Sequence, residues 1–205
     1  MKTIDINTWD RKELFQHFLK LKDPYFGVTI PFNVENTYQY AKDNNVSFFG
    51  VYLHDCMKAI NAIDNLKYRI ADNTVQIYDT IHASATIMRT NKTFGFSFID
   101  YDKDLNVFLS NLSAEKRRIE RTSNLFPPVN GLNCIHCSAL PWLNFSGHKE
   151  PVSGVLDSVP KLSFGKTVKE GNKLMMNVAI NVNHALVDGY HVGLFSEIFQ
   201  KNLNK

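Results

Sequence analysis

The chain has 205 residues, of which 44% are hydrophobic and 21% are charged. This composition is ordinary for a soluble globular protein, and the length suits a single domain over residues 1–205. The net charge of +3 is too small to indicate nucleic-acid binding. No apolar run reaches membrane-spanning length and the first residues do not resemble a signal peptide, so we expect a cytoplasmic protein without a membrane partner. Three cysteines predict free thiols.

Periodic apolar patterns divide the chain into helices and strands. A period of about 3.6 residues marks a helix, and a period of two marks a half-buried strand. Turn-forming pairs such as Asp23-Pro24 and Asp72-Asn73 separate the segments. Helices are expected at residues 11–22, 34–43, 48–63, 104–122 and after residue 188, and strands at 25–33, 68–70, 75–78, 82–89, 94–99, from 134, at 156–165 and at 173–183. This order predicts an α+β fold with helices packed on a large mixed sheet.

Two patterns that suggest a function are better explained by structure. Cys134-Ile135-His136-Cys137 has the spacing of a zinc or redox motif. On a strand, however, residues three apart point to opposite faces, so Cys134 and Cys137 cannot bind one metal ion together, and we expect no metal site. The charged run Glu115-Lys116-Arg117-Arg118 is expected to be the solvated side of its helix.

The strongest functional signal begins at Leu174. Apolar and polar residues alternate from there to Val182, which predicts a strand with one buried face, and His184 continues the buried positions. Asp188-Gly189 ends the alternation, and helical spacing follows, with Asp188 well suited as the N-cap. A single histidine at a strand end is commonly a structural residue, so the spacing alone does not make His184 catalytic.

The full string around His184 is more specific. His184, followed after three residues by Asp188-Gly189, an aromatic residue and His191, resembles the active-site signature of the chloramphenicol acetyltransferase family. That family is related to the catalytic cores of the dihydrolipoyl acyltransferases. His184 matches the family's catalytic histidine, whereas Asn183 replaces a second histidine that usually precedes it.

A second signature supports the resemblance. Ser138-Ala139-Leu140-Pro141-Trp142 resembles a family motif whose serine supplies a hydroxyl to the reacting centre. Trp9-Asp10-Arg11 resembles the family's opening motif, whose arginine forms an ion pair with the aspartate matched by Asp188. Asp188 is therefore expected to support the position of His184 without touching its imidazole.

The resemblance covers the chain from Trp9 to about Phe199. It implies an α+β two-layer sandwich like that of the chloramphenicol acetyltransferases, acetyl-CoA as co-substrate, a small-molecule hydroxyl acceptor, and a homotrimer with sites at subunit interfaces. It also implies that three residues lie near bound CoA, namely Lys166, Trp142 and Ser163. The acceptor pocket is expected to include Phe18, Phe94, Phe96, Phe126 and Phe145, with Asn183 supporting the site.

The implied mechanism is direct acetyl transfer. His184 removes the proton of the acceptor hydroxyl as it attacks the thioester, and Ser138 stabilises the oxyanion, without an acyl-enzyme. The acceptor stays open, because residues 146–152 bring two charges and a histidine where the family has an apolar wall, and Phe96 is bulkier than its family counterpart. The alternatives are chloramphenicol O-acetylation, acyl transfer to another hydroxyl acceptor, and a binding trimer without catalysis.

Overall fold

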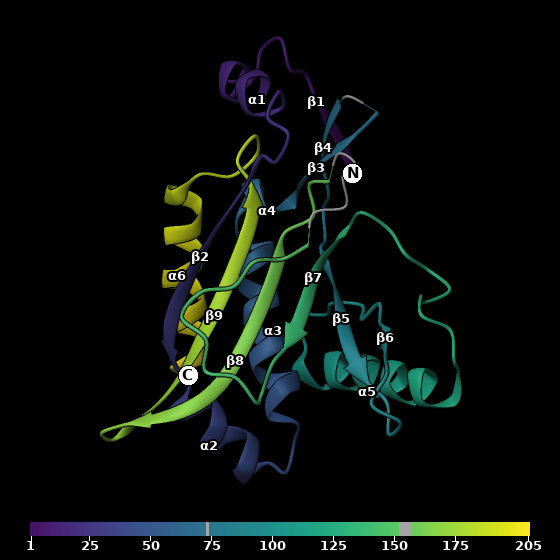
Figure 1. Ribbon diagram of the computed structural model, residues 1–205, viewed down its shortest axis with the longest axis vertical. Helices are drawn as coiled ribbons and strands as arrows, with labels where there is room; N and C mark the ends of the chain where they lie inside the picture. Colours follow the sequence, from purple (N-terminus) through teal and green to yellow (C-terminus); the bar gives the residue numbers. More distant parts are fainter. Residues whose placement is uncertain (73, 152–156) are drawn as a thin grey trace.

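The computed structural model describes residues 1–72, 74–151 and 157–205, and shows helices packed on one face of a large sheet (Figure 1). This confirms the predicted α+β architecture. None of the helices in these described ranges is long and apolar enough to cross a membrane. The helices are α1 (Lys12–Phe18), α2 (Glu35–Asp43), α3 (Phe48–Asn61), α4 (Asp64–Lys67), α5 (Leu105–Arg121) and α6 (Gly189–Leu203).

The strands form two sheets. The larger has the order β2-β9-β8-β7-β5-β6 and the smaller the order β1-β4-β3. In the larger sheet β7 runs parallel to β5 and β8, and the other neighbours are antiparallel. The strands are β1 (Lys2–Ile4), β2 (Tyr25–Asn33), β3 (Tyr68–Ala71), β4 (Thr74–Ile77), β5 (His82–Met88), β6 (Phe94–Phe96), β7 (Cys134–Ala139), β8 (Lys161–Glu170) and β9 (Lys173–Asn183).

Helix α3 is the centre of the helical layer. Ser47 caps it by accepting a hydrogen bond from the Gly50 amide at 3.2 Å, and nearly all of the helix is buried, as its apolar sequence predicts. At Gly50 an added Cβ would lie 2.4 Å from the side chain of Leu109 on α5, so a larger residue here would require that side chain to move. Most of the buried apolar residues form one cluster that reaches both sheets.

The opposite face of the large sheet is crossed by the chain that follows β7 (Figure 1). The Lys166 amide donates to the Leu143 carbonyl at 2.8 Å, and Asn177 Nδ2 donates to the Phe145 carbonyl at 2.9 Å. An added Cβ on Gly165 would lie 3.0 Å from the Asn177 carbonyl oxygen. The glycine therefore lets this segment lie directly on β8 and β9.

Two predicted boundaries were wrong. The helix expected at residues 11–22 ends at Phe18, and the following residues continue as single turns, with Leu21 donating to the Phe18 carbonyl at 3.1 Å. The strand expected at residues 156–165 is β8, which begins at Lys161 and extends to Glu170. Residue 156 itself, like Asn73 in the predicted hairpin turn, lies outside the described residues.

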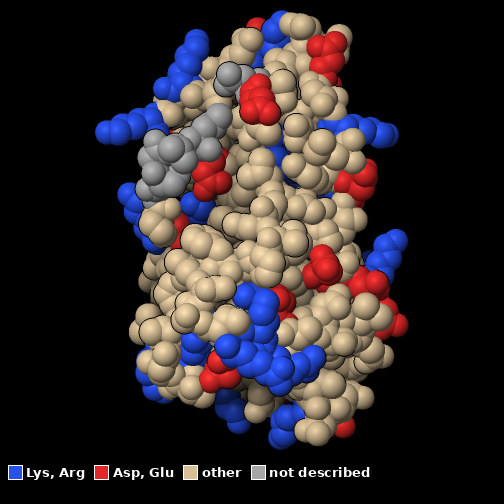
Figure 2. Space-filling view, turned by 90° about the vertical axis from the view of Figure 1, so that its right-hand side faces the viewer, with Lys and Arg blue, Asp and Glu red and all other residues tan. Residues whose placement is uncertain are grey.

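The interpretation of the charged run on α5 was also wrong in part. Arg118 donates to Glu115 at 2.7 Å and to the Phe96 carbonyl at 2.8 Å, and Glu115 accepts from the Phe98 amide at 2.8 Å. These two side chains therefore attach α5 to the segment around β6. Figure 2 shows the face of the molecule that lies on the right in Figure 1, and basic side chains gather in the lower half of that face. The last turn of α5 is also basic. Positive charge there is favourable at the carboxyl end of a helix.

Candidate active site

His184 follows β9 directly and its ring packs against two aromatic side chains. Its amide donates to the Pro24 carbonyl at 2.9 Å, which attaches the end of β9 to the start of β2. Phe18 stacks on the imidazole with ring centres 4.0 Å apart, and Phe26 lies at 4.6 Å. The side chain is 34% exposed. The structure thus fixes the plane of the imidazole while leaving part of it accessible.

The predicted ion pair between Arg11 and Asp188 is present. Both terminal nitrogens of Arg11 donate to the Asp188 carboxylate, one of them at 3.1 Å, and Nη2 also donates to the His184 carbonyl at 3.3 Å. The hydrogen bond from Arg11 is the main cause that lowers the pKa of Asp188 below its ordinary value. Asp188 also begins α6, where its amide donates to Nδ1 of His191 at 3.0 Å.

Asp188 comes closer to the imidazole than the resemblance implied. Its Oδ1 lies 3.3 Å from Nδ1 of His184, although the angle is not that of a hydrogen bond, and this buried nitrogen has no hydrogen-bond partner within the described ranges. Asp188 therefore lies beside the ring without a hydrogen bond to it. A carboxylate beside Nδ1 favours a proton on that nitrogen, which leaves Nε2 as the basic atom.

Asn183 organises the turn between β9 and α6. Its side-chain oxygen accepts from the Ala185 amide at 2.9 Å, and its Nδ2 donates to the Asp157 carbonyl at 2.9 Å. Its own carbonyl accepts the amides of Leu186 and Val187, both at 3.0 Å. Because Asn183 is only 1% exposed, its part in the site is to shape the backbone that carries His184.

Loss of Arg11 is expected to destabilise this corner. Arg11→Ala leaves the partly buried Asp188 without its cation and should lower the free energy of unfolding by about 1–3 kcal/mol at pH 7. Since the folded pKa of Asp188 is depressed, this stabilisation is present above the unfolded pKa of about 3.9 and is lost as the pH falls through the folded pKa. Urea unfolding at fixed protein concentration, at neutral and at acidic pH, measures both effects. The exposed Arg117→Ala is the control, and equal stability of the two variants would contradict the role of the pair.

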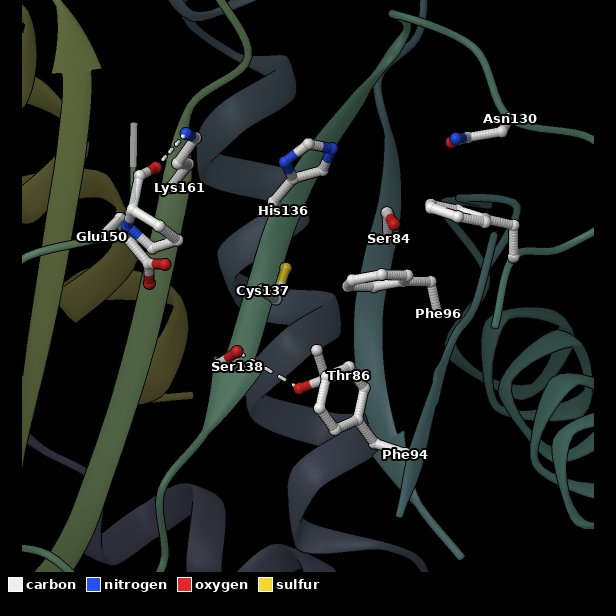
Figure 3. Close-up of a pocket in the computed structure, with 12 residues that line it drawn as sticks. Ser84, Thr86, Phe94, Phe96, Asn130, His136, Cys137, Ser138, Glu150 and Lys161 are labelled. Carbon is white, nitrogen blue, oxygen red and sulfur yellow. Dashed lines mark hydrogen bonds between the residues drawn. The ribbon is translucent and has the colours of Figure 1, made fainter. Parts of the chain in front are cut away.

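A separate cavity of about 350 Å³ lies beside Ser138 (Figure 3). The Ser138 hydroxyl lies 3.2 Å from that of Thr86 on the neighbouring strand β5. Phe94, Phe96 and Phe126, three of the residues expected in the acceptor pocket, line this cavity, with Phe96 stacked on Phe126 at 5.4 Å. Sequence reasoning did not identify Thr86, although its place in the alternation of β5 is a signal that it shares a sheet face with Ser84.

The other side of the cavity is polar and includes His136, Glu150 and Lys161. His136 shares a face with Ser138, as predicted, and burial lowers its pKa. Glu150 belongs to the segment that departs from the family pattern. It does not turn outward, because its Oε1 accepts a hydrogen bond from the buried Ser163 at 2.8 Å. Ser163, which the resemblance places near CoA, supports this carboxylate.

The remaining predicted residues lie elsewhere. Phe18 stacks on His184 and is not among the residues that line the cavity, and Phe145 lies outside it, packed against His148 at 5.4 Å. Lys166 and Trp142 are both exposed, and the loop that carries Trp142 is bonded to β8 beside Lys166. The three cysteines are free and buried.

One chain does not bring His184 to Ser138. In the sheet Ser138 pairs with Ser163, which pairs with Ala179 of β9. His184 is five residues beyond Ala179, which corresponds to about 16 Å at 3.3 Å per residue, and β9 is two strand spacings, about 10 Å, from β7. Chemistry that uses both side chains therefore requires a second copy of the chain.

Comparison with known proteins gives consistent similarities. The model of the family described as "Chloramphenicol acetyltransferase" matches residues 1–200. Chloramphenicol acetyltransferase 3 of Escherichia coli is 27% identical over 203 residues, covering 98% of this chain and 95% of that protein. The chloramphenicol acetyltransferase of Bacillus pumilus is 28% identical over 199 residues, covering 96% and 90%.

Solved structures give the same result for the fold. A chloramphenicol acetyltransferase superposes with a TM-score of 0.88 at 27% identity, covering 98% of this chain and 99% of the other. A probable dihydrolipoamide acetyltransferase from Listeria monocytogenes superposes with a TM-score of 0.68 at 11% identity, covering 100% and 94%. The second similarity shows a shared fold alone.

Proposed function

The chain belongs to the chloramphenicol acetyltransferase family and is an acetyl-CoA-dependent acyltransferase, and we propose that it inactivates chloramphenicol by acetylating a hydroxyl group of the drug. The observation that carries this proposal is the fixed imidazole of His184. It is stacked on Phe18, has Asp188 beside Nδ1, and is partly exposed on its outer side. A histidine held in this way suits proton transfer at neutral pH.

In the proposed reaction, Nε2 of His184 takes the proton of the acceptor hydroxyl while the oxygen attacks the thioester carbonyl. The carbonyl electron pair moves onto its oxygen, which the Ser138 hydroxyl stabilises as a hydrogen-bond donor. When the carbon–sulfur bond breaks, the electron pair returns, and the imidazolium gives its proton to the CoA sulfur. General base catalysis of this kind contributes roughly 10²–10⁴-fold to the rate.

The proposed active unit is a homotrimer in the cytoplasm, where acetyl-CoA is available. Its sites lie between subunits, so that His184 of one chain meets Ser138 and the phenylalanine-lined cavity of the next. The wide separation of the two side chains in one sheet supports this arrangement. Lys166 and Trp142, both exposed beside each other on the open face, are the proposed contacts for CoA.

A second candidate function is acetyl transfer to a different hydroxyl acceptor. The observation that favours it is Glu150, whose carboxylate lines the cavity where the resemblance led us to expect an apolar wall. A binding trimer without catalysis is disfavoured by the intact arrangement of Arg11, Asp188 and His184.

Release of the CoA thiol from acetyl-CoA, with and without chloramphenicol, tests the proposal. We expect drug-dependent release together with a product whose mass has increased by one acetyl group. If acetyl-CoA binds but the drug does not increase release, chloramphenicol is not the acceptor, and a panel of alcohols in the same assay tests the second candidate.

A further inference from the structure

The cavity beside Ser138 has an apolar side and a charged side, which face each other in Figure 3. Three phenylalanines form the apolar side, so an aromatic acceptor is expected to pack there. The opposite side is formed by His136, Glu150 and Lys161. The charges on this side of the cavity therefore decide which polar group of an acceptor can bind there.

The charges on this side do not cancel. Nζ of Lys161 lies 3.0 Å from a carboxylate oxygen of Asp157 and donates to the Pro151 carbonyl at 3.1 Å, so its charge is already balanced. Burial lowers the pKa of His136, which favours its neutral form. Among the described residues that line the cavity, Glu150 is thus a carboxylate whose charge no lining cation is left to balance.

Glu150 is fixed in the wall of the cavity that Ser138 also lines. Ser163 donates to its Oε1 at 2.8 Å, and Nδ1 of His148 lies 3.6 Å from the same oxygen, which is too far for a hydrogen bond. Ser163 is the register partner of Ser138, and neighbouring strands are about 4.8 Å apart. Because Glu150 and Ser138 line the same cavity, a negative charge on Glu150 opposes an oxyanion held by Ser138, and a bound cation would weaken that effect.

We propose that Glu150 determines acceptor specificity, and that the preferred acceptor is an aromatic amino alcohol whose ammonium group is next to the hydroxyl that is acetylated. The inference rests on the proposed acetyl transfer and specifies the acceptor class of that site. An ammonium group forms a charge-assisted hydrogen bond with the carboxylate. A neutral amide at the same place leaves a partly buried charge without a partner.

The test compares chloramphenicol with the amine obtained by removing its dichloroacetyl group. The two compounds share the ring and both hydroxyls. Chloramphenicol carries a neutral amide at the position where the other compound carries an ammonium group. Thiol release gives kcat/KM for each, and mass spectrometry with NMR identifies the O-acetyl product in samples quenched with acid, which prevents migration of the acetyl group to the neighbouring amine. The wild-type chain is expected to prefer the amine. Glu150→Gln should lower the ratio of amine to chloramphenicol kcat/KM by about tenfold or more, whereas the exposed Glu197→Gln should not.

Glu150→Asp separates charge from shape, because it keeps the carboxylate and is expected to retain most of the preference. The inference would be overturned, with the proposed acetyl transfer left standing, by either of two results. One is an unchanged ratio of amine to chloramphenicol kcat/KM in Glu150→Gln, and the other is an equal fall of this ratio in the Gln and Asp variants. If the wild-type chain prefers chloramphenicol to the amine, that result also overturns the inference, and no variant is needed to show it. If neither compound increases thiol release, the proposed function and the inference both fail.

Discussion

Replacement of His184 by alanine is expected to lower kcat for acetyl transfer by at least 10²–10⁴-fold, the contribution of a positioned general base. The side chains that contact His184 cannot replace it as the base, because Phe18 and Phe26 are apolar and the nearby Asp188 is committed to Arg11. Thiol release with saturating acetyl-CoA and acceptor measures the loss, and size-exclusion chromatography shows whether assembly is retained.

His17→Ala is the matched control for this variant. His17 is exposed on α1 and contacts the edge of Phe18, the ring that stacks on His184. Its loss alters the surroundings of the site without removing the proposed base, so kcat should change by less than about threefold. Substantial turnover by the His184→Ala variant would remove His184 from the mechanism.

Mixing two defective chains is expected to restore activity. His184→Ala removes the base, and Ser138→Ala removes one oxyanion donor at a cost of about 10²-fold. If each site takes His184 from one subunit and Ser138 from the next, unfolding and refolding an equal mixture creates sites in which both residues are intact. Random assembly makes about one site in four intact, so roughly a quarter of the wild-type rate should return.

Two controls make this mixing experiment decisive. Chains that are mixed without unfolding should keep the mean of the two low rates, because sites with both residues intact form only when subunits reassemble. A refolded mixture that also stays at this mean would show that the two residues do not act across a subunit boundary. It would contradict the interface proposal while leaving the His184→Ala result unaffected.

Much of the fold could be predicted because local periodicity determines it. The alternation from Leu174 to Val182 corresponds to β9, and the apolar helix expected at residues 48–63 is α3. Boundaries that depend on distant contacts were less well predicted. Glu115 was expected in solvent because its sequence neighbours are charged, but it accepts a hydrogen bond from Phe98, which approaches only in the folded chain.

Only part of the candidate site could likewise be predicted from the sequence. Arg11 and Asp188 could be paired through motifs, although 177 positions separate them, and the structure shows the pair. The stacking of Phe18 on His184 and the inward direction of Glu150 depend on how loops pack on the sheet. One-dimensional spacing contains no information on loop packing, so these contacts could not be predicted.

The pairing of β2 with β9 has a further consequence, which concerns the rate of folding. Tyr25 pairs with Asn183 and Asn33 with Met175, so one edge of the large sheet is joined by residues about 140–160 positions apart. Closing so long a loop costs entropy before any contact compensates for it, and proteins dominated by such contacts fold slowly. During synthesis β2 has no partner strand until β9 has been made. The nascent chain therefore exposes an apolar strand for most of its translation, and chaperones that shield such strands should increase the yield of active protein.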